Sequence, residues 1–561
     1  MVFEYQNQKF LTDNDLKISY LGRFPEILIE NPELLELFQK EYGRNFLGGD
    51  EIISFRQALV SRGMDFRKLE NEILETAIKT GKPISEIVFN KTTTGIGSGH
   101  SMGGLSGVVL GLNGTKMIDS GLTGLVSSRS LVTSGRRRDI KVEDIVVPES
   151  IAKRKELLNE YLEISRDAFK ESNDFKERFG KSQGIETFNK ALPYNNPADL
   201  FIVLPLDTMA TLAFEVKQDK LNPNGPFLPR EIYTLVEKFP EIAEENGIGT
   251  MYKQRIQVPR DTYFHYNVFK DPDFPNYPLE LMEEFGLSLK PKLVDSYFNL
   301  TKGFMKGLDG LKKTFDKTKK IKNPEELSEA SIKCMLDTRE FVGEYNETAR
   351  LTILDTLSFR VWSEQKRHAT LRQNVESIYS ATKRASEKIK EFWPQIETAY
   401  TTKKGYENLP VDKLEQIMVI DEKIKRNPEL LVPYVYHAGR QLMFFDKLVD
   451  EGVPIRDAAY MIPRNTRVTT LENYDLANLI DLELPLRLCK ECEPERYETS
   501  WKKRKVIAEA IPELKPFLQP KCGVGYCTEG NFCGHIESLR EYDDVLHKKT
   551  KEVMLRKAGC E

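Results

Sequence analysis

A repeat within the chain limits the folds open to this sequence more than any other feature. The first pair of similar segments is LTGLVSSRSLVTSGRRR (122–138) and LDTLSFRVWSEQKRHA (354–369). In both segments one arginine stands seven residues before another: Arg129 before Arg136, and Arg360 before Arg367. The second pair, which follows in the same order, is DLFIVLPLDTMATLAFE (199–215) and AAYMIPRNTRVTTLEN (458–473). Similar segments in the same order predict a duplicated module.

Chain length and charge distribution indicate how the two copies are arranged. With 561 residues the chain exceeds what one hydrophobic core usually serves. The stretch 302–322 carries eight lysines and ends just before Asn323-Pro324, as expected for a solvated connection. We therefore predict an N-terminal module at residues 1–300, a Lys-rich linker at 301–324 and a C-terminal module at 325–561.

Composition argues against several classes of protein. Hydrophobic residues make up 40% of the chain, charged residues 30%, and the formal net charge is −4. So small a net charge does not indicate a nucleic-acid partner. No run of about 18 apolar residues occurs, so we expect no membrane partner. The first residues lack the basic and apolar pattern of a secretion signal, and we expect a cytoplasmic location.

Apolar periodicity predicts a strand and a long helix in the first half. Residues 140–147 alternate between apolar and polar, with a bulge after Val142. Beyond Pro148 the spacing predicts a helix over about 150–171. Its apolar positions are Ile151, Leu157, Leu158, Tyr161, Leu162 and Ile164. The sequence from 324 to about 400 is also typical of helix.

The cysteines are concentrated near the C-terminus, where six of the seven lie between Cys489 and Cys560. A reducing compartment and an odd count argue against a disulfide framework. Four of them have a spacing compatible with a tetrahedral zinc site: Cys489, Cys492, Cys522 and Cys527. The alternative is a set of buried thiols that hold the C-terminal tail in place.

The segment GHSMG (99–103) matches the Gly-x-Ser-x-Gly pattern of a hydrolase nucleophile elbow, with Ser101 as the nucleophile. An elbow follows a buried strand, whereas the residues before Gly99 are rich in threonine and glycine. A serine hydrolase is therefore a remote alternative. The glycines would otherwise let the backbone approach a phosphate, or form a loop.

A motif in the second half combines cationic and small polar residues in RHATLRQNVESIY (367–379). It matches in part the pattern Arg-His-Arg, two residues, Ser, four residues, Ser, one residue, Arg, with an asparagine in the middle. The matching residues are Arg367, His368, Asn374 and Ser377. Arg360 and Gln365 match an arginine and a glutamine that precede the pattern. Three further segments match in order: GVPIRDAAYMIP (452–463), LRLC (486–489) with the later Glu495, and KCGVGYCTEGNFCGH (521–535).

These segments cover most of residues 340–536 and resemble the flavin-dependent thymidylate synthases. The resemblance implies an α+β fold in which each copy packs long helices on a small, mainly antiparallel sheet. It implies FAD as cofactor, conversion of dUMP to dTMP, methylene-tetrahydrofolate as carbon donor and NADPH as reductant. The cofactor carries the difficult step and no enzyme nucleophile is needed, so no catalytic residue is expected, cysteines included.

Both ligands carry phosphate, which favours planar, permanently charged guanidinium groups. The segment Gly99-His100-Ser101 is similar to the family's Gly-His-x-Ser entry to its flavin site. The cofactor-binding residues that the resemblance implies are Arg360, Arg367, His368, Asn374, His100 and Ser101. The substrate-binding candidates are Ser377, Arg372, Arg487, Arg136, Arg137 and Arg138.

The motif departs from the family pattern at three positions, where Ala369, Arg372 and Tyr379 replace arginine, serine and arginine. Each lost charge-assisted hydrogen bond is worth roughly 1.5–3 kcal/mol. Arg372 is one candidate to restore a charge. Arg136–Arg138 are another, because the family's active sites lie between subunits and a fused duplicate could share them.

Several alternatives stay open. Arg487 can simply pair with Glu483 or Glu491 on its own helix, and Arg136–Arg138 can form a solvated turn. A catalytically diverged paralogue with a binding or scaffold role is the second candidate function. By analogy with the family's homotetramers, we expect a homo-oligomer, a dimer of tandem copies, with a nucleotide as substrate.

Overall fold

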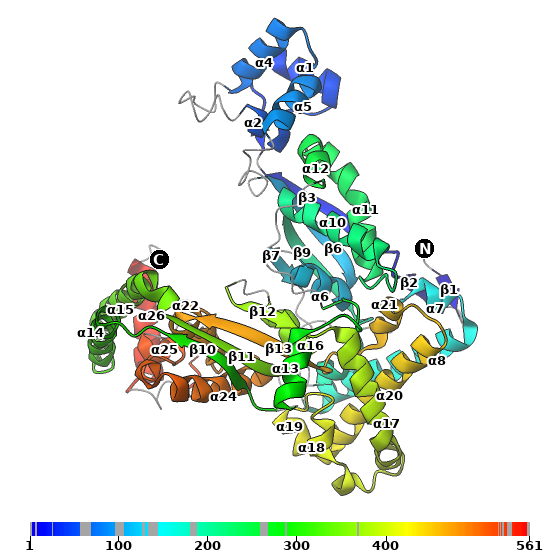
Figure 1. Ribbon diagram of the computed structural model, residues 1–561, viewed down its shortest axis with the longest axis vertical. Coiled ribbons are helices and arrows are strands. Elements are labelled where there is room, and N and C mark those ends of the chain that lie inside the picture. The colour runs from blue at the N-terminus through cyan, green and yellow to red at the C-terminus, as the bar shows by residue number, and fades with distance from the viewer. Residues whose placement is uncertain are drawn as a thin grey trace. The chain divides into compact units, whose positions relative to one another are not determined.

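The computed structural model of the chain describes residues 3–5, 8–24, 26–55, 69–95, 106–125, 129–132, 144–179, 188–257, 268–286, 289–366, 370–525, 527, 529, 532–535 and 541–557. The chain divides into two units (Figure 1). The first comprises Met1–Asp273, Ile389–Thr402 and Val432–Arg464, and the second comprises Phe274–Lys388, Lys403–Leu431 and Asn465–Glu561. Each contains a four-stranded antiparallel sheet and many helices, in agreement with the predicted α+β class.

The sheet of the first unit has the strand order β3-β6-β9-β7. Its strands are β3 (Lys17–Phe24), β6 (Gly107–Thr115), β9 (Pro197–Pro205) and β7 (Arg129–Val132). One face carries the alternating apolar side chains that strands use to build a core, and all of them are buried: Val108, Leu110, Leu112, Leu200, Ile202 and Leu204. Helix α6 (Lys116–Leu125) packs on β6 and β9, and α10 (Leu206–Leu221) contacts β9.

A helical segment with its own core is inserted between β3 and β6. Its helices are α1 (Pro32–Tyr42), α2 (Gly49–Ser54), α4 (Leu69–Thr80) and α5 (Ile84–Gly95). Leu34, Phe38, Leu69 and Ile73 are among the buried side chains of this separate cluster. Before it, β1 (Phe3–Tyr5) and β2 (Gln8–Thr12) form a hairpin. The predicted strand over 140–147 is described only as β8 (Val146–Val147), which pairs in parallel with β2.

The long helix expected over about 150–171 is present as two helices. A short α7 (Glu149–Ala152) precedes α8 (Lys155–Phe179). The apolar side chains that predicted the helix are all buried: Ile151, Leu157, Leu158, Tyr161, Leu162 and Ile164. The periodicity was therefore sound, and only the helix boundaries differ.

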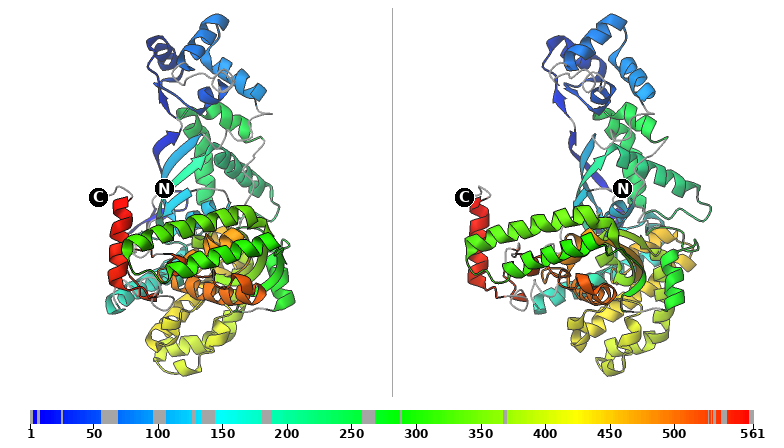
Figure 2. Two further views of the ribbon diagram at one scale, coloured as in Figure 1. Left: turned by 90° about the vertical axis from the view of Figure 1, so that its left-hand side faces the viewer. Right: turned by 60° about the vertical axis from the view of Figure 1, so that its left-hand side comes forward.

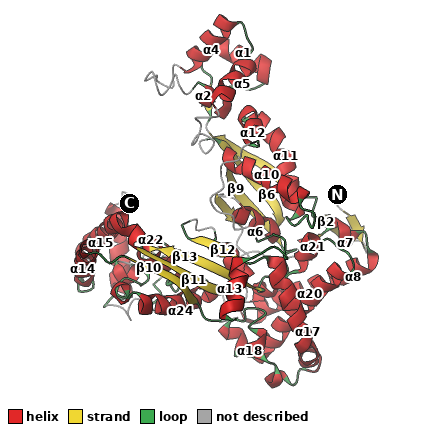
Figure 3. Ribbon diagram, in the orientation of Figure 1, coloured by secondary structure: helices red, strands yellow, loops and turns green. Residues whose placement is uncertain are grey.

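The sheet of the second unit has the order β10-β11-β13-β12. Its strands are β10 (Lys292–Phe298), β11 (Ala349–Ser358), β13 (Arg467–Asp475) and β12 (Arg372–Val375). Helix α24 (Pro494–Ala510) lies against β10 and β11, and α13 (Tyr277–Phe285) packs on β11, β12 and β13 (Figure 3). Residues 324–400 are therefore not helical throughout, because they include β11 and β12.

The Lys-rich stretch that we expected as a linker contains α14 (Lys302–Thr318). Figure 2 shows α14 beside α15 (Pro324–Tyr345), with α26 (Asp544–Lys557) against α15. Phe304, Leu308, Leu311 and Phe315 are buried along one side of α14, at the spacing of an apolar helix face. No helix in the described part of the chain is long and apolar enough to cross a membrane.

The two sheets share a chain path. In each, the strands lie in the order first, second, fourth, third, and all neighbours are antiparallel. Each second strand runs directly into a short helix: β6 into α6, and β11 into α16 (Phe359–Gln365).

The register of both sequence matches differs from the structure. In the first, Arg129 begins strand β7 whereas Arg360 lies in helix α16, so the two arginines do not occupy equivalent places. In the second, Leu204-Pro205 ends β9, whereas Ile462-Pro463 stands before β13. The segment that precedes β9 in the same way is Leu192-Pro193, and Pro193 pairs with Pro463 in an antiparallel bridge. Leu192-Pro-x-Asn and Ile462-Pro-x-Asn are thus the corresponding stretches, each after a 3-10 turn.

Candidate functional site

The motif of the second half, residues 367–379, begins just after α16 and includes the edge strand β12. Arg367, His368 and Ala369 are outside the described residues, as are His100, Ser101 and Arg136–Arg138. The structure therefore leaves their predicted roles, the composite site and the hydrolase elbow as predictions. The chain is described again from Thr370, and β12 begins two residues later.

On β12 the motif residues alternate between the two faces of the sheet. Arg372 and Asn374 are exposed, whereas Gln373 and Val375 are buried. Because side chains along a strand alternate, Arg372 and Asn374 project from the same face. Ser377 does not share this face, since it is buried at the N-terminus of α17 (Ile378–Thr402).

A polar row continues from Arg372 across the same face. Arg372 lies opposite Asn473 of β13, which lies opposite Thr352 of β11. The Thr352 hydroxyl donates a hydrogen bond to Asn473 Oδ1 at 2.9 Å. This face therefore offers a guanidinium, two amides and a hydroxyl at the surface.

Arg360 and Arg487, two other predicted ligand residues, each pair with a carboxylate one turn away on the same helix. Arg360 is buried in α16, where it lies 3.6 Å from Glu364 and also close to Glu493 and Glu495. Arg487 Nε donates to Glu483 Oε1 at 2.7 Å, one helical turn earlier on α23 (Glu483–Arg487). Glu483 is one of the two partners that the sequence offered for Arg487.

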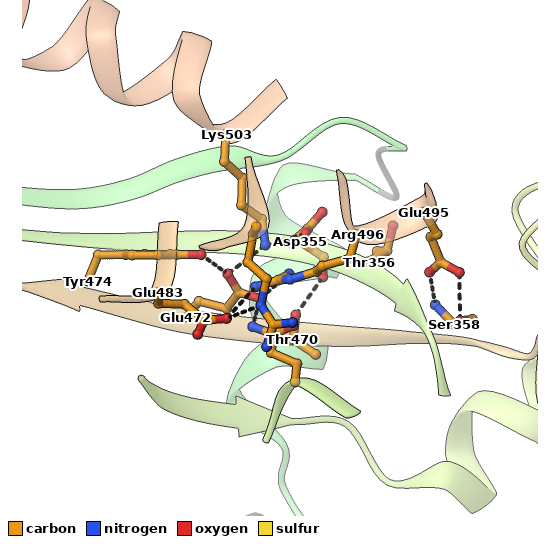
Figure 4. Close-up of polar contacts among 12 residues, drawn as sticks. Asp355, Thr356, Ser358, Thr470, Glu472, Tyr474, Glu483, Glu495, Arg496 and Lys503 are labelled. Atoms are coloured by element: carbon orange, nitrogen blue, oxygen red, sulfur yellow. Dashed lines mark hydrogen bonds and ion pairs between the residues drawn. The ribbon is translucent and has the colours of Figure 1, made fainter. Parts of the chain in front are cut away.

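A buried ionic cluster occupies the opposite face of the second sheet (Figure 4). Lys503 Nζ lies 2.7 Å from Asp355 and 2.6 Å from Glu472. Arg496 is 3.2 Å from Glu472 and 3.6 Å from Glu483. Ion pairs this deep in a core need full hydrogen bonding to offset their desolvation.

Glu472 is the centre of this cluster. Its carboxylate also accepts hydrogen bonds from Gln365 Nε2 and from the Tyr474 hydroxyl, both at 2.7 Å. Burial would raise the pKa of Glu472, but Lys503 and Arg496 outweigh it and hold the pKa well below its usual range. Glu472 and Asn473 are adjacent on β13, so the cluster and the Arg372 row lie on opposite faces of the sheet.

The start of α16 is fixed by a buried glutamate. Ser358 is the N-cap of α16, and its hydroxyl accepts from Val361 N at 3.2 Å. Glu495, on α24, accepts from Ser358 N at 2.6 Å and from Ser358 Oγ at 2.7 Å. With Gln365 bound to Glu472, side chains from elsewhere in the unit hold both ends of this seven-residue helix.

The first unit contains the same arrangement. Thr115 ends β6, directly before α6, and its hydroxyl accepts from Met117 N at 3.1 Å. Glu231, on α11 (Arg230–Glu245), accepts from Thr115 N at 2.8 Å and from Thr115 Oγ1 at 2.6 Å. Burial raises the pKa of Glu231 to about 7, although the bonds from Thr115 act in the opposite direction.

Of the four cysteines proposed as zinc ligands, Cys522 and Cys527 are buried, whereas Cys489 and Cys492 are partly exposed. Among the described residues, no group of three or more His, Cys, Asp or Glu side chains is arranged to hold a metal ion. Burial raises the pKa of Cys489 to about 11 and that of Cys522 to about 12, which keeps both thiols neutral. Cys522 and Cys527 belong to an apolar cluster with Leu327.

Comparison with known proteins places the chain near one enzyme family. It is 30% identical to a flavin-dependent thymidylate synthase of Pyrococcus horikoshii over 152 residues, which is 26% of this chain and 62% of that protein. It is 29% identical over 123 residues to the enzyme of that name from Thermococcus onnurineus, and 28% over 124 residues to that of Pyrococcus abyssi. These matches cover 21% of this chain and 49% and 50% of those proteins.

The comparisons support a distant relationship to the flavin-dependent thymidylate synthases. The chain spans between about half and 62% of the length of these curated relatives. No family model matches the sequence. The resemblance found in the motifs is thus supported at the level of the family relationship.

Sequence reasoning missed most of the residues that organise the interior around α16. Glu472, Arg496 and Lys503 carry no motif, and their contacts join β13 to α24 across the fold. Glu495 was identified in the sequence as the later glutamate after LRLC. Glu231 was missed, although it also stands shortly after a proline at the start of its helix, in Pro229-Arg-Glu. Each of these two glutamates binds the residue that precedes the short helix after the second strand of its sheet.

Proposed function

We propose that the second unit carries a flavin-dependent thymidylate synthase-like site that converts dUMP to dTMP, or performs a closely related nucleotide methylation. Methylene-tetrahydrofolate would supply the carbon, and NADPH would reduce the FAD. The observation that carries this proposal is the relationship to four curated enzymes of that name, at 25–30% identity. Bound flavin would supply the hydride, and the chain would bind and orient the ligands.

The described residues that fit a phosphorylated ligand are Arg372 and Asn374. Both are exposed on β12, in the stretch that directly follows Arg367-His368. A guanidinium suits phosphate, and an amide suits the polar edge of a flavin or uracil ring. Arg360 and Arg487 fit this role less well, because carboxylates inside the unit already neutralise them.

The test uses the full chain and titrates it with FAD and then with dUMP. We expect a flavin absorbance band, and NADPH oxidation that dUMP stimulates. Arg372→Ala with Asn374→Ala should weaken binding by at least tenfold, since each lost bond to a charged group is worth about 1.5–3 kcal/mol. Arg350→Ala, another exposed arginine of this sheet, is the matched control. A folded chain that takes up neither ligand would contradict the proposal.

A catalytically diverged paralogue with a binding or scaffold role is the second candidate. The observation that favours it is that Arg360 and Arg487, two of the expected ligand arginines, pair with glutamates of their own helices. Such a protein would stay colourless with added FAD while remaining folded. The same titration therefore separates the two candidates.

We also propose that the chain is a tandem duplicate that assembles as a dimer. The shared strand order, the corresponding Leu192-Pro193 and Ile462-Pro463, and the matching contacts of Glu231 and Glu495 support the duplication. Contacts so specific at equivalent places are hard to explain by convergence. An experimental structure in which the two sheets differ in strand order would contradict it.

A further inference from the structure

The edge strand β12 is short, and its register decides which side chains reach the surface. It has four residues and pairs on one side with β13, where Gln373 lies opposite Glu472. A slip by one residue would turn Arg372 and Asn374 toward the core and bring Gln373 out, because side chains alternate along a strand. Four residues of pairing are little to prevent such a slip, so other contacts are needed.

Asn478 binds the chain just before the strand. Its Nδ2 donates to the carbonyl oxygen of Thr370 at 3.0 Å. Asn478 is 1% exposed and lies on α22 (Leu476–Ile480), which directly follows β13. The side chain is itself held, since Nδ2 also donates to Asp475 Oδ1 at 2.8 Å. A group fixed to β13 thus sets the position of the residue that leads into β12.

Glu376 binds the chain at the other end of the strand. Its carboxylate accepts from Thr469 N at 2.9 Å, and its own N–H donates to Thr469 O at 2.9 Å. Arg384, on α17, forms an ion pair with both carboxylate oxygens. Glu376 is fully buried, so the charge of Arg384 is needed to keep the carboxylate in place. Both ends of β12 are therefore tied to β13 by side chains.

We propose that Asn478 and Glu376 are positioning residues that fix the register of β12 and so direct Arg372 and Asn374 toward a phosphorylated ligand. That a phosphorylated ligand binds at this strand rests on the proposed function. The two anchors lie on either side of the strand, and neither belongs to the exposed row. They act on the ligand only through the strand that they hold.

The experiment compares amide hydrogen exchange of β12 with ligand affinity in the full chain. Asn478→Ala removes the first anchor and Glu376→Ala the second, while Glu376→Gln keeps an oxygen for Thr469 N. The matched control is Asn346→Ala, because Asn346 binds Asp475 and Ala477 N of the same helix but not Thr370. FAD and dUMP are the ligands titrated.

We expect Asn478→Ala to raise exchange in residues 372–375 about tenfold, the effect of losing its one hydrogen bond to Thr370. Glu376→Ala should raise it at least as much, because it also removes the ion pair with Arg384. Exchange in β10 should not change, FAD or dUMP should bind about tenfold more weakly, and Glu376→Gln should restore most of the affinity. If Glu376→Ala does not fold, Asn478→Ala and Asn346→Ala carry the comparison.

Equal exchange of β12 in Asn478→Ala and Asn346→Ala would overturn the inference. Faster exchange with unchanged affinity would overturn it as well, because the register would then not govern binding. A wild-type chain that binds neither FAD nor dUMP would instead refute the proposed function. In that case the exchange comparison alone decides whether the two residues fix the strand.

Discussion

Replacing Glu231 with glutamine would remove a carboxyl group whose ionisation opposes folding at neutral pH. Glu231 is 2% exposed, and its two oxygens accept the backbone and hydroxyl bonds of Thr115. Burial is the main cause that raises its pKa to about 7, and the nearby carboxylate of Asp13 raises it further. Glutamine has nearly the same shape and keeps an oxygen for Thr115 N, so the substitution mainly removes the titration.

The size of the expected change in unfolding free energy follows from the shift in the pKa of Glu231. The usual pKa is 4.5 and the folded value is about 7, so the folded state holds the proton more tightly than the unfolded state. The stabilising contribution is complete below pH 4.5 and is lost as the pH rises through 7. At 1.36 kcal/mol per pH unit, the whole window amounts to about 3 kcal/mol, of which roughly 2.5 kcal/mol falls between pH 5 and 8.

The assay is urea unfolding of wild type and Glu231→Gln at pH 5 and pH 8, read as the difference between the two proteins. The difference is needed because burial also raises the pKa of Asp13 to about 6 and that of Asp50 to about 7, which gives both proteins the same background slope. Glu237→Gln, an exposed position on the same helix, should show no pH-dependent difference. If Glu231→Gln gains no stability over wild type between pH 5 and 8, the carboxyl does not titrate as the structure indicates.

Two further perturbations test the second unit and the assembly. Lys503→Met leaves Asp355 and Glu472 buried without their shared cation. Urea unfolding should therefore show a free energy of unfolding about 3–5 kcal/mol lower than that of wild type. The matched control is Lys502→Met at an exposed position, which should change the free energy of unfolding by less than about 0.5 kcal/mol. Light scattering should give twice the 64.6 kDa mass of the chain if tandem copies form a dimer, and a monomer would contradict that assembly.

The spacing of apolar residues in the sequence is enough to predict helices that bury one face. The apolar positions that predicted α8 are helical in period, and these side chains are buried. The Lys-rich stretch carries an equally regular set, Phe304, Leu308, Leu311 and Phe315, which its lysines obscured. A search for period before composition would have identified α14. Leu192-Pro193 was missed for a similar reason, because Leu204-Pro205 resembles Ile462-Pro463 just as closely in letters.

The candidate site was harder to predict, because its contacts join residues far apart in the chain. The pair of Arg487 with Glu483 lies within one helical turn and was among the expected alternatives. The bonds of Glu472 to Gln365 and Lys503 span 107 and 31 residues, so no motif reveals them. To predict that Arg372 and Asn374 lie on the same face, one would have to know that this part of the motif is a strand.

Glu495 and Glu231 make similar contacts but differ in one charged neighbour. In the second unit the residue two places after Ser358 is Arg360, which is buried close to Glu495. In the first unit the residue two places after Thr115 is Met117, which is buried but uncharged. Arg360 therefore lies where it supplies a positive charge beside the second carboxyl, whereas Met117 supplies none beside Glu231. This role accounts for the presence of Arg360 without a flavin. Arg372 and Asn374 are then the motif residues of β12 that lie exposed, and the proposed ligand role falls to them.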